Sequence, residues 1–111
     1  MVELELTDFD TDQRLLEMSG VSLVIFTSVG CTSCRFAREQ LPRLDLAIER
    51  LCWIDAGGNG GVVERYQVFH LPALFLVRDG EFFGPVQSCL TSAGLNEAVR
   101  QALSRYAEEL P

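Results

Sequence analysis

The sequence has no lysine, and its nine basic residues, all arginine, are outnumbered by sixteen acidic ones, which gives a net charge of −7 at pH 7. Contact with a nucleic-acid backbone needs clustered cations, so we expect no nucleic-acid partner. The sequence also has no apolar run of the roughly 20 residues that a membrane-spanning helix needs. We therefore expect no membrane interaction.

The N-terminal residues 1–6 lack the basic segment and unbroken apolar stretch of a secretory signal. This pattern predicts a cytoplasmic protein. In a reducing cytoplasm, the four cysteines are expected to be thiols, catalysts or metal ligands rather than structural disulfides.

The chain of 111 residues, with 48% hydrophobic and 23% charged residues, has the size and composition of one folded domain covering residues 1–111. Strand-like and helix-like patterns alternate along it, which predicts an α/β layout. Strands are predicted over 2–6, 21–27, 51–55, 73–77 and 81–86, and helices over 12–18, 32–50, 62–66 and about 95–106.

Three details of this layout are specific enough to test. Phe36, Leu41, Leu44 and Ile48 are spaced to line one face of the 32–50 helix, and a kink is expected at Pro42 inside it. The glycine-rich residues 57–61 are expected to form a flexible loop. An Asp-Gly pair at 79–80, between two apolar runs, predicts an antiparallel hairpin.

The motif Cys31-Thr32-Ser33-Cys34 lies where a buried strand is predicted to end and a helix to begin. Free amide groups and the positive end of the helix dipole stabilise a thiolate at such a position. The i, i+3 spacing stacks the two sulfur atoms on one side of the helix, so a disulfide can close with little backbone movement. We expect Cys31, at the exposed tip, to be the nucleophile, and Cys34 to be the resolving thiol with the higher pKa.

A zinc site is the alternative interpretation of two cysteines at this spacing. Zinc needs three or four ligands, and the remaining candidates, Cys52, Cys89 and His70, are scattered along the sequence. We therefore expect no metal. Cys52 is predicted to be a core residue, whereas Cys89, near the start of the last helix, is the better candidate for an exposed regulatory thiol.

Three segments together resemble the thioredoxin family: residues 24–34 around the two cysteines, residues 71–76, and Asp79-Gly80-Glu81. The resemblance spans nearly the whole chain. It implies the thioredoxin fold, an α/β fold whose central mixed β-sheet carries a C-terminal antiparallel hairpin and is flanked by helices. It also implies that a cis peptide bond precedes Pro72, which faces the cysteines, and that the backbone of Leu71 pairs with an extended substrate peptide.

Two family residues are replaced in this sequence. Gly30 stands where thioredoxins usually have tryptophan, so an aromatic surface is missing from the substrate groove. Ile25 stands where they usually have a buried aspartate, which is the implied proton acceptor for the resolving thiol.

Two further replacements lie beside the cysteines. Thr32 and Ser33 replace the usual Gly-Pro pair, and both hydroxyls are expected to donate to a thiolate at Cys31, which would lower its pKa. Ser88 replaces a glycine after the last strand and is expected to narrow the groove.

Residues near the motif supply further candidates. His70, two residues before the proline, is a candidate for tuning the nucleophile. Arg35 is a second candidate for tuning, and together with Arg38 it either acts on the thiols or is an ordinary solvated side chain. Gly30, Thr32, Ser33, Leu71 and Pro72 are the predicted substrate-binding residues.

These features predict a thiol-disulfide oxidoreductase that acts on protein disulfides or thiols, without a cofactor, with electrons from a thioredoxin reductase or glutathione. The losses at Ile25 and Gly30 favour an alternative from another class. In that alternative, the chain is a thioredoxin-fold binding module or redox-sensing adaptor with little or no turnover.

Overall fold

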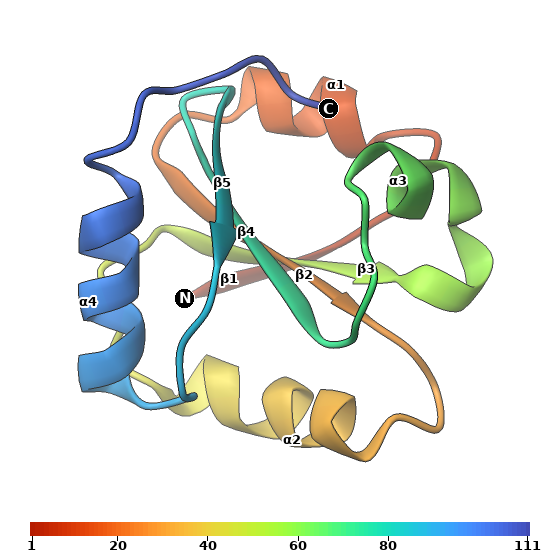
Figure 1. Cartoon of the computed structure of the whole chain (residues 1–111), viewed down its shortest axis with the longest axis horizontal. Coiled ribbons are helices and arrows are strands. Elements are labelled where there is room, and N and C mark those ends of the chain that lie inside the picture. Colours follow the sequence, from red (N-terminus) through yellow and green to blue (C-terminus); the bar gives the residue numbers. More distant parts are fainter.

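The computed structural model describes residues 1–111 and contains five strands and four α-helices in the predicted order, β-α-β-α-β-α-β-β-α (Figure 1). The sheet has the strand order β1-β3-β2-β4-β5, in which β1, β3 and β2 are parallel and β4 and β5 are antiparallel to their neighbours. The bounds are β1 Val2–Leu6, α1 Thr11–Glu17, β2 Val21–Thr27, α2 Thr32–Gln40, β3 Arg50–Asp55, α3 Gly60–Arg65, β4 Ala73–Arg78, β5 Glu81–Val86 and α4 Ser92–Ala102.

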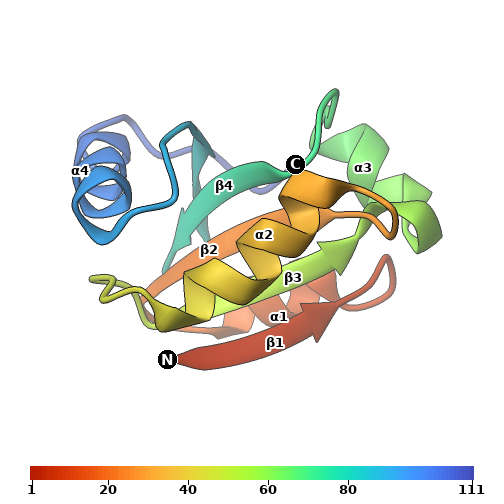
Figure 2. The same cartoon turned by 90° about the horizontal axis from the view of Figure 1, so that it is seen from below.

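The sheet separates two hydrophobic cores, because alternate side chains of a strand point to opposite faces. Helices α2 and α4 cover one face, and α1 and α3 cover the other (Figures 1 and 2). In β2, which is buried along its whole length, Leu23 and Ile25 belong to the first core, while Val24 and Phe26 belong to the second. The central strand is thus covered on both sides, and its C-terminal end leads directly into α2.

The hairpin prediction is confirmed. Asp79 has φ 53° and Gly80 has φ 77°, so both central residues of the turn between β4 and β5 are left-handed, as a two-residue hairpin of this sequence requires. The Asp79 carboxylate also accepts a hydrogen bond of 2.7 Å from the amide of Gly20, at the end of α1.

The prediction of a helix over residues 32–50 is wrong beyond residue 40. Helix α2 ends at Gln40 and continues only as a short 3₁₀ turn, Leu41–Arg43. Pro42 has no amide hydrogen to donate, and its ring collides with the preceding turn of an α-helix, so the helix stops instead of kinking. Leu44 and Ile48 still pack on the first core, but from an irregular segment.

Two aromatic residues within the predicted helices lie outside the core. Phe36 is 55% exposed, whereas Cys34, Ala37 and Leu41 make the buried side of α2 and its extension. Tyr106 is 99% exposed, because α4 ends at Ala102 and the chain turns away from the helix. Helical spacing alone did not distinguish the inner from the outer face.

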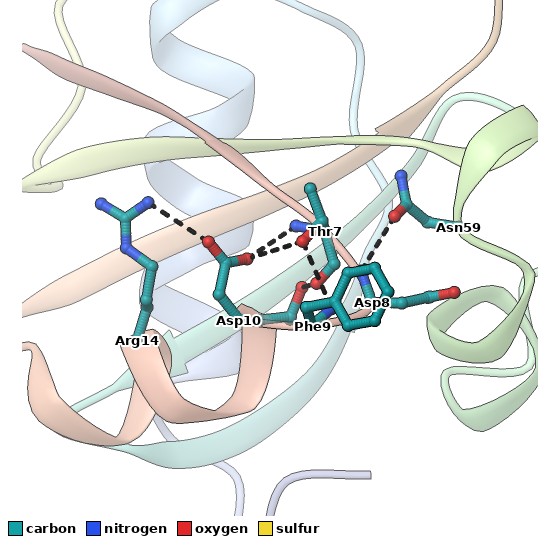
Figure 3. Close-up of polar contacts among 7 residues, drawn as sticks. Thr7, Asp8, Phe9, Asp10, Arg14 and Asn59 are labelled. Atoms are coloured by element: carbon teal, nitrogen blue, oxygen red, sulfur yellow. Dashed lines mark hydrogen bonds and ion pairs between the residues drawn. The ribbon is translucent and has the colours of Figure 1, made fainter.

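The glycine-rich segment is held in place at both ends, which contradicts its prediction as a flexible loop. It forms a 3₁₀ turn, residues 56–58, followed by α3. The Asp8 carboxylate accepts hydrogen bonds from the amides of Gly61 and Val62, at 3.2 and 2.8 Å. The Asp8 amide donates to Asn59 Oδ1 at 2.8 Å (Figure 3). The β1–α1 connection is itself closed by Asp10, whose carboxylate accepts from the Thr7 amide at 2.8 Å (Figure 3).

The C-terminal tail was not predicted as an ordered element. Glu108 and Phe82 exchange two backbone hydrogen bonds of 2.8 Å, so the tail pairs with the edge strand β5. The Arg105 guanidinium donates to the carbonyls of Phe83 and Pro85, at 3.0 and 2.7 Å. The tail ends beside α1 (Figure 1). No helix of the structure combines the length and the apolar character needed to cross a membrane.

Candidate active site

The two cysteines of the motif occupy different environments at the start of α2. Gly30, with φ 88°, makes the turn that separates β2 from the helix, and Cys31 is the N-cap residue. The Cys31 sulfur accepts a hydrogen bond of 3.2 Å from the amide of Cys34. Cys31 is partly exposed, and Cys34 is 1% exposed. The strand-to-helix junction therefore presents one sulfur to solvent and shields the other.

This arrangement separates the pKa values of the two thiols. Hydrogen bonds from the Cys34 side chain, and then from Ser33, lower the pKa of Cys31, because both stabilise its thiolate. Burial raises the pKa of Cys34, and its role as donor to Cys31 raises it further. The two pKa values therefore differ in the direction that the sequence predicts, with the exposed Cys31 thiol as the more acidic of the two.

The peptide bond between Leu71 and Pro72 is cis, as the resemblance implies. This segment, which precedes β4, faces the motif, since the Cys31 sulfur lies 4.0 Å from the Leu71 carbonyl oxygen. The amide and carbonyl of Leu71 make no hydrogen bond to another backbone group of the chain. Both groups are therefore available to an extended peptide laid beside the Cys31 sulfur.

A groove of about 300 Å³ runs from the helix tip across this segment to the loop after β5. Its floor and rim combine apolar and small polar side chains. They are Ser33 and Phe36 of α2, His70, Pro72 and Leu74 of the cis-proline segment and β4, and Val86, Gln87, Ser88, Cys89 and Leu90. The exposed Phe36, assigned to the core by its spacing, thus contributes to a surface beside the motif.

A second hollow, of about 440 Å³, lies behind the motif, and the buried Cys34 lines it. Two cations of α2, Arg35 and Arg38, and one carboxylate, Asp55 at the end of β3, also line it. The remaining lining residues are Thr27, Ser28, Val29 and Gly30. Asp55 was missed because its proximity depends on the pairing of β3 with β2, where it lies opposite Thr27.

Of the residues predicted to act on Cys31, Ser33 lies within hydrogen-bond distance of its sulfur, whereas Thr32, His70 and Arg35 form no hydrogen bond with it. The Ser33 hydroxyl lies 3.4 Å from the Cys31 sulfur, whereas Thr32 is exposed and forms no hydrogen bond with it, so only one of the two expected donors is in place. His70 lines the groove without bonding to Cys31, and Arg35 forms no ion pair.

The other two cysteines are separate from the pair. Cys52 is fully buried in the second core, as predicted, and burial raises its pKa to about 11. Cys89 is exposed, on the far side of the groove from the motif helix. No group of three or more histidine, cysteine, aspartate or glutamate side chains is placed to hold a metal ion.

We predict that Ser33→Ala raises the pKa of Cys31 toward its ordinary value, because the thiolate loses a hydrogen bond. At neutral pH a smaller fraction would be thiolate, so Cys31 would react a few-fold more slowly with iodoacetamide. Thr32→Ala, which removes the neighbouring hydroxyl, should leave the rate unchanged. The measurement is the pH profile of alkylation, followed at Cys31 by fragment-ion mass spectrometry. Equal profiles for Ser33→Ala and the unmodified protein would contradict the assigned contact.

The chain matches no protein-family model. It is similar to the thioredoxins of several Staphylococcus aureus strains, among them N315 and COL, with 29% identity over 84 residues that make up 73% of this chain and 79% of the thioredoxin. Among solved structures, human ERp44 in its zinc-bound form superposes with a TM-score of 0.71 and 17% identity over 89% of this chain. The match covers 30% of the ERp44 chain, and it confirms the fold expected from the sequence.

Proposed function

The chain is a thioredoxin-like protein, and on this premise we propose that it is a thiol-disulfide oxidoreductase in which Cys31 attacks a substrate disulfide and Cys34 resolves the intermediate. One observation carries the proposal. The Cys31 sulfur is partly exposed at the N-cap and accepts a hydrogen bond from the Cys34 amide, while the Cys34 sulfur lies buried one helical turn away. The thioredoxin relatives support the same redox chemistry.

The reaction has two balanced steps. The Cys31 thiolate attacks one sulfur of the substrate disulfide, so a mixed disulfide forms and the other substrate sulfur leaves as a thiolate. Cys34 then loses its proton and attacks the Cys31 sulfur, which forms the Cys31–Cys34 disulfide and releases the second substrate thiolate. Two electrons pass from the protein to the substrate, and the lower pKa of Cys31 makes it the first nucleophile.

Protein disulfides fit the site better than small ones. The groove is lined by apolar side chains such as Phe36 and Leu90, and the Leu71 amide and carbonyl make no hydrogen bond to another backbone group, so they can pair with an extended chain. An extended peptide held this way places its disulfide near the Cys31 sulfur, which lies beside the Leu71 carbonyl. Pro72 and Ser33 then line the path of the peptide.

The proposed reaction also needs a source of electrons in the cell. A dithiol that reduces its substrates must be returned to the reduced form, and a thioredoxin reductase or glutathione would supply the electrons in a reducing cytoplasm. No organic cofactor or metal takes part in either step.

Trapping the intermediate tests this proposal. In Cys34→Ser the resolving thiol is absent, so a covalent adduct between Cys31 and a disulfide-containing protein such as insulin should accumulate and be visible on a non-reducing gel. Cys31→Ser, which keeps Cys34 and the other two thiols, is the matched control and should form no such adduct at this site. Peptide mass spectrometry of the adduct identifies the linked cysteine.

Equal adduct yields in the two variants would contradict the proposal. A site that binds reduced and oxidised partners equally, without any covalent adduct, would instead favour the binding module or adaptor, the interpretation prompted by Gly30 and Ile25.

A further inference from the structure

The resolving step in this chain lacks the buried carboxylate that the family resemblance implies on β2. Ile25, in the place of the usual aspartate, is fully buried in the first core and pairs with Trp53 of β3. Cys34 must nevertheless become a thiolate before it attacks, although burial opposes its ionisation. Some other group near the sulfur has to favour the charged form.

The hollow behind the motif shows what faces Cys34. Cys34 lines this hollow and is absent from the groove on the other side. The charged groups around the hollow are Arg35 and Arg38 of α2 and Asp55 of β3. The Asp55 carboxylate accepts a hydrogen bond of 3.2 Å from the Gly57 amide in its own turn. The hollow is therefore richer in positive than in negative charge.

Arg38 is the cation whose position is fixed. It follows Cys34 by four residues, so both side chains lie on the same side of α2. Its guanidinium lies 4.3 Å from the centre of the Trp53 ring, 3.4 Å from the Thr27 hydroxyl, and in an ion pair with Glu5 of β1. Three elements of the sheet thus hold one guanidinium next to the hollow.

We propose that Arg38 is a positioning residue for the resolving step: its guanidinium, fixed beside the hollow, stabilises the Cys34 thiolate that attacks the Cys31 mixed disulfide. This rests on the proposed oxidoreductase function. The Cys34 proton leaves to solvent, the bond between the two cysteine sulfurs forms, and the bond to the substrate sulfur breaks. The fixed cation does not accept the proton; it favours the thiolate electrostatically in a chain that lacks the carboxylate proton acceptor that the family resemblance implies.

The direction of the electrostatic effect agrees with this geometry. Burial and the hydrogen bond to Cys31 raise the pKa of Cys34, whereas the backbone of Ser28 and, to a smaller extent, the Arg38 guanidinium lower it. Arg38 is thus the side-chain cation that favours the Cys34 thiolate, and Arg35, on the same helix, forms no ion pair that would hold it in place. Glu5 partly neutralises Arg38, but its side chain is 63% exposed and solvent screens it more strongly.

The experiment follows both chemical steps in one reaction with 5,5′-dithiobis(2-nitrobenzoate), in a Cys89→Ser background that removes the other exposed thiol. Attack by Cys31 releases the first nitrothiolate, and resolution by Cys34 releases the second. Arg38→Gln is compared with Arg38→Lys, which keeps the charge, and with Arg43→Gln, which removes an exposed cation outside the hollow.

When the pH is below the pKa of a thiol, each unit rise in that pKa lowers the thiolate fraction about tenfold. The more basic thiolate is also a stronger nucleophile, and this offsets about half of the resulting loss in rate on a logarithmic scale. We expect Arg38→Gln to slow the second phase by a few-fold at most near pH 7, with a deficit that disappears at alkaline pH. Arg38→Lys should recover most of the rate, and Arg43→Gln should match the parent.

The first phase is the internal control, because a variant with a damaged site would slow both phases at every pH. A second phase in Arg38→Gln that equals the parent across the pH range would overturn the role of Arg38 and leave the oxidoreductase proposal intact. A parent that shows no second phase would contradict the oxidoreductase proposal itself, together with this inference.

Discussion

Replacement of Cys31 by serine should reduce insulin-disulfide turnover to the rate of dithiothreitol alone, a loss of orders of magnitude. A serine hydroxyl does not ionise at neutral pH, so the amide of Cys34 and the Ser33 hydroxyl would have no thiolate to stabilise. The other thiols are poor substitutes. Cys34 is 1% exposed with a raised pKa, and Cys52 is fully buried. Cys89 is exposed, but it lies between β5 and α4 and not at the N-cap of α2.

Cys52→Ala is the matched control for this loss. It also removes one thiol, but from the second core on the opposite side of the sheet from α2, so turnover should remain near that of the unmodified protein. The measurement is the rate of insulin precipitation with dithiothreitol as the electron donor. Turnover by Cys31→Ser at the rate of the unmodified protein would refute the assignment of Cys31 as the nucleophile.

Phe26→Ala should cause a large loss of stability, about 3–5 kcal/mol in the free energy of unfolding. Phe26 is fully buried in β2, and its ring centre lies 5.5 Å from that of Tyr66 and 5.7 Å from that of Phe75. Truncation removes these contacts and leaves a cavity between the sheet and α3, where close-packed neighbours relax only in part.

Phe69→Ala is the control of identical chemistry. Phe69 is 87% exposed, so the same truncation should change the free energy of unfolding by less than about 0.5 kcal/mol. Urea unfolding of both variants, analysed with a shared slope, gives the comparison. Similar losses in the two variants would show that the aromatic cluster around Phe26 does not dominate the second core.

The order of the elements could be predicted because each strand carries a clear local signal. The unbroken apolar run of β2 indicates a central strand, and the Asp-Gly pair at 79–80 fixes the hairpin that follows β4. The nucleophile and the resolving thiol also follow from local features, since a helix N-terminus and an i, i+3 spacing are properties of one short segment.

The errors come from interactions between segments far apart in the sequence. Helical spacing placed Phe36 inside, but the inner face of α2 is set by how the helix packs on β2 and β3, which puts Ala37 there. The glycine-rich segment is ordered by Asp8, which is more than 50 residues away in sequence. No pattern within residues 57–61 contains that information.

The same limit applies to the site. Asp55 enters the hollow behind Cys34 only because β3 lies beside β2, a pairing that the sequence does not state. The sequence shows that Arg38 follows Cys34 by four residues. The contacts that hold its guanidinium, with Glu5, Thr27 and Trp53, depend on the order of three strands in the sheet. Local spacing therefore predicted that the two sulfur atoms lie together at the start of α2, and the fold supplied the charges around them.

Reversible disulfide formation between Cys31 and Cys34 can be measured directly as a redox equilibrium in a graded series of glutathione buffers, with the remaining thiols counted by alkylation and mass spectrometry. We expect a single reversible two-electron transition in which both thiols disappear together and one intramolecular disulfide forms. A pair that stays reduced in every buffer, or that gains glutathione on one cysteine without closing a disulfide, would contradict it.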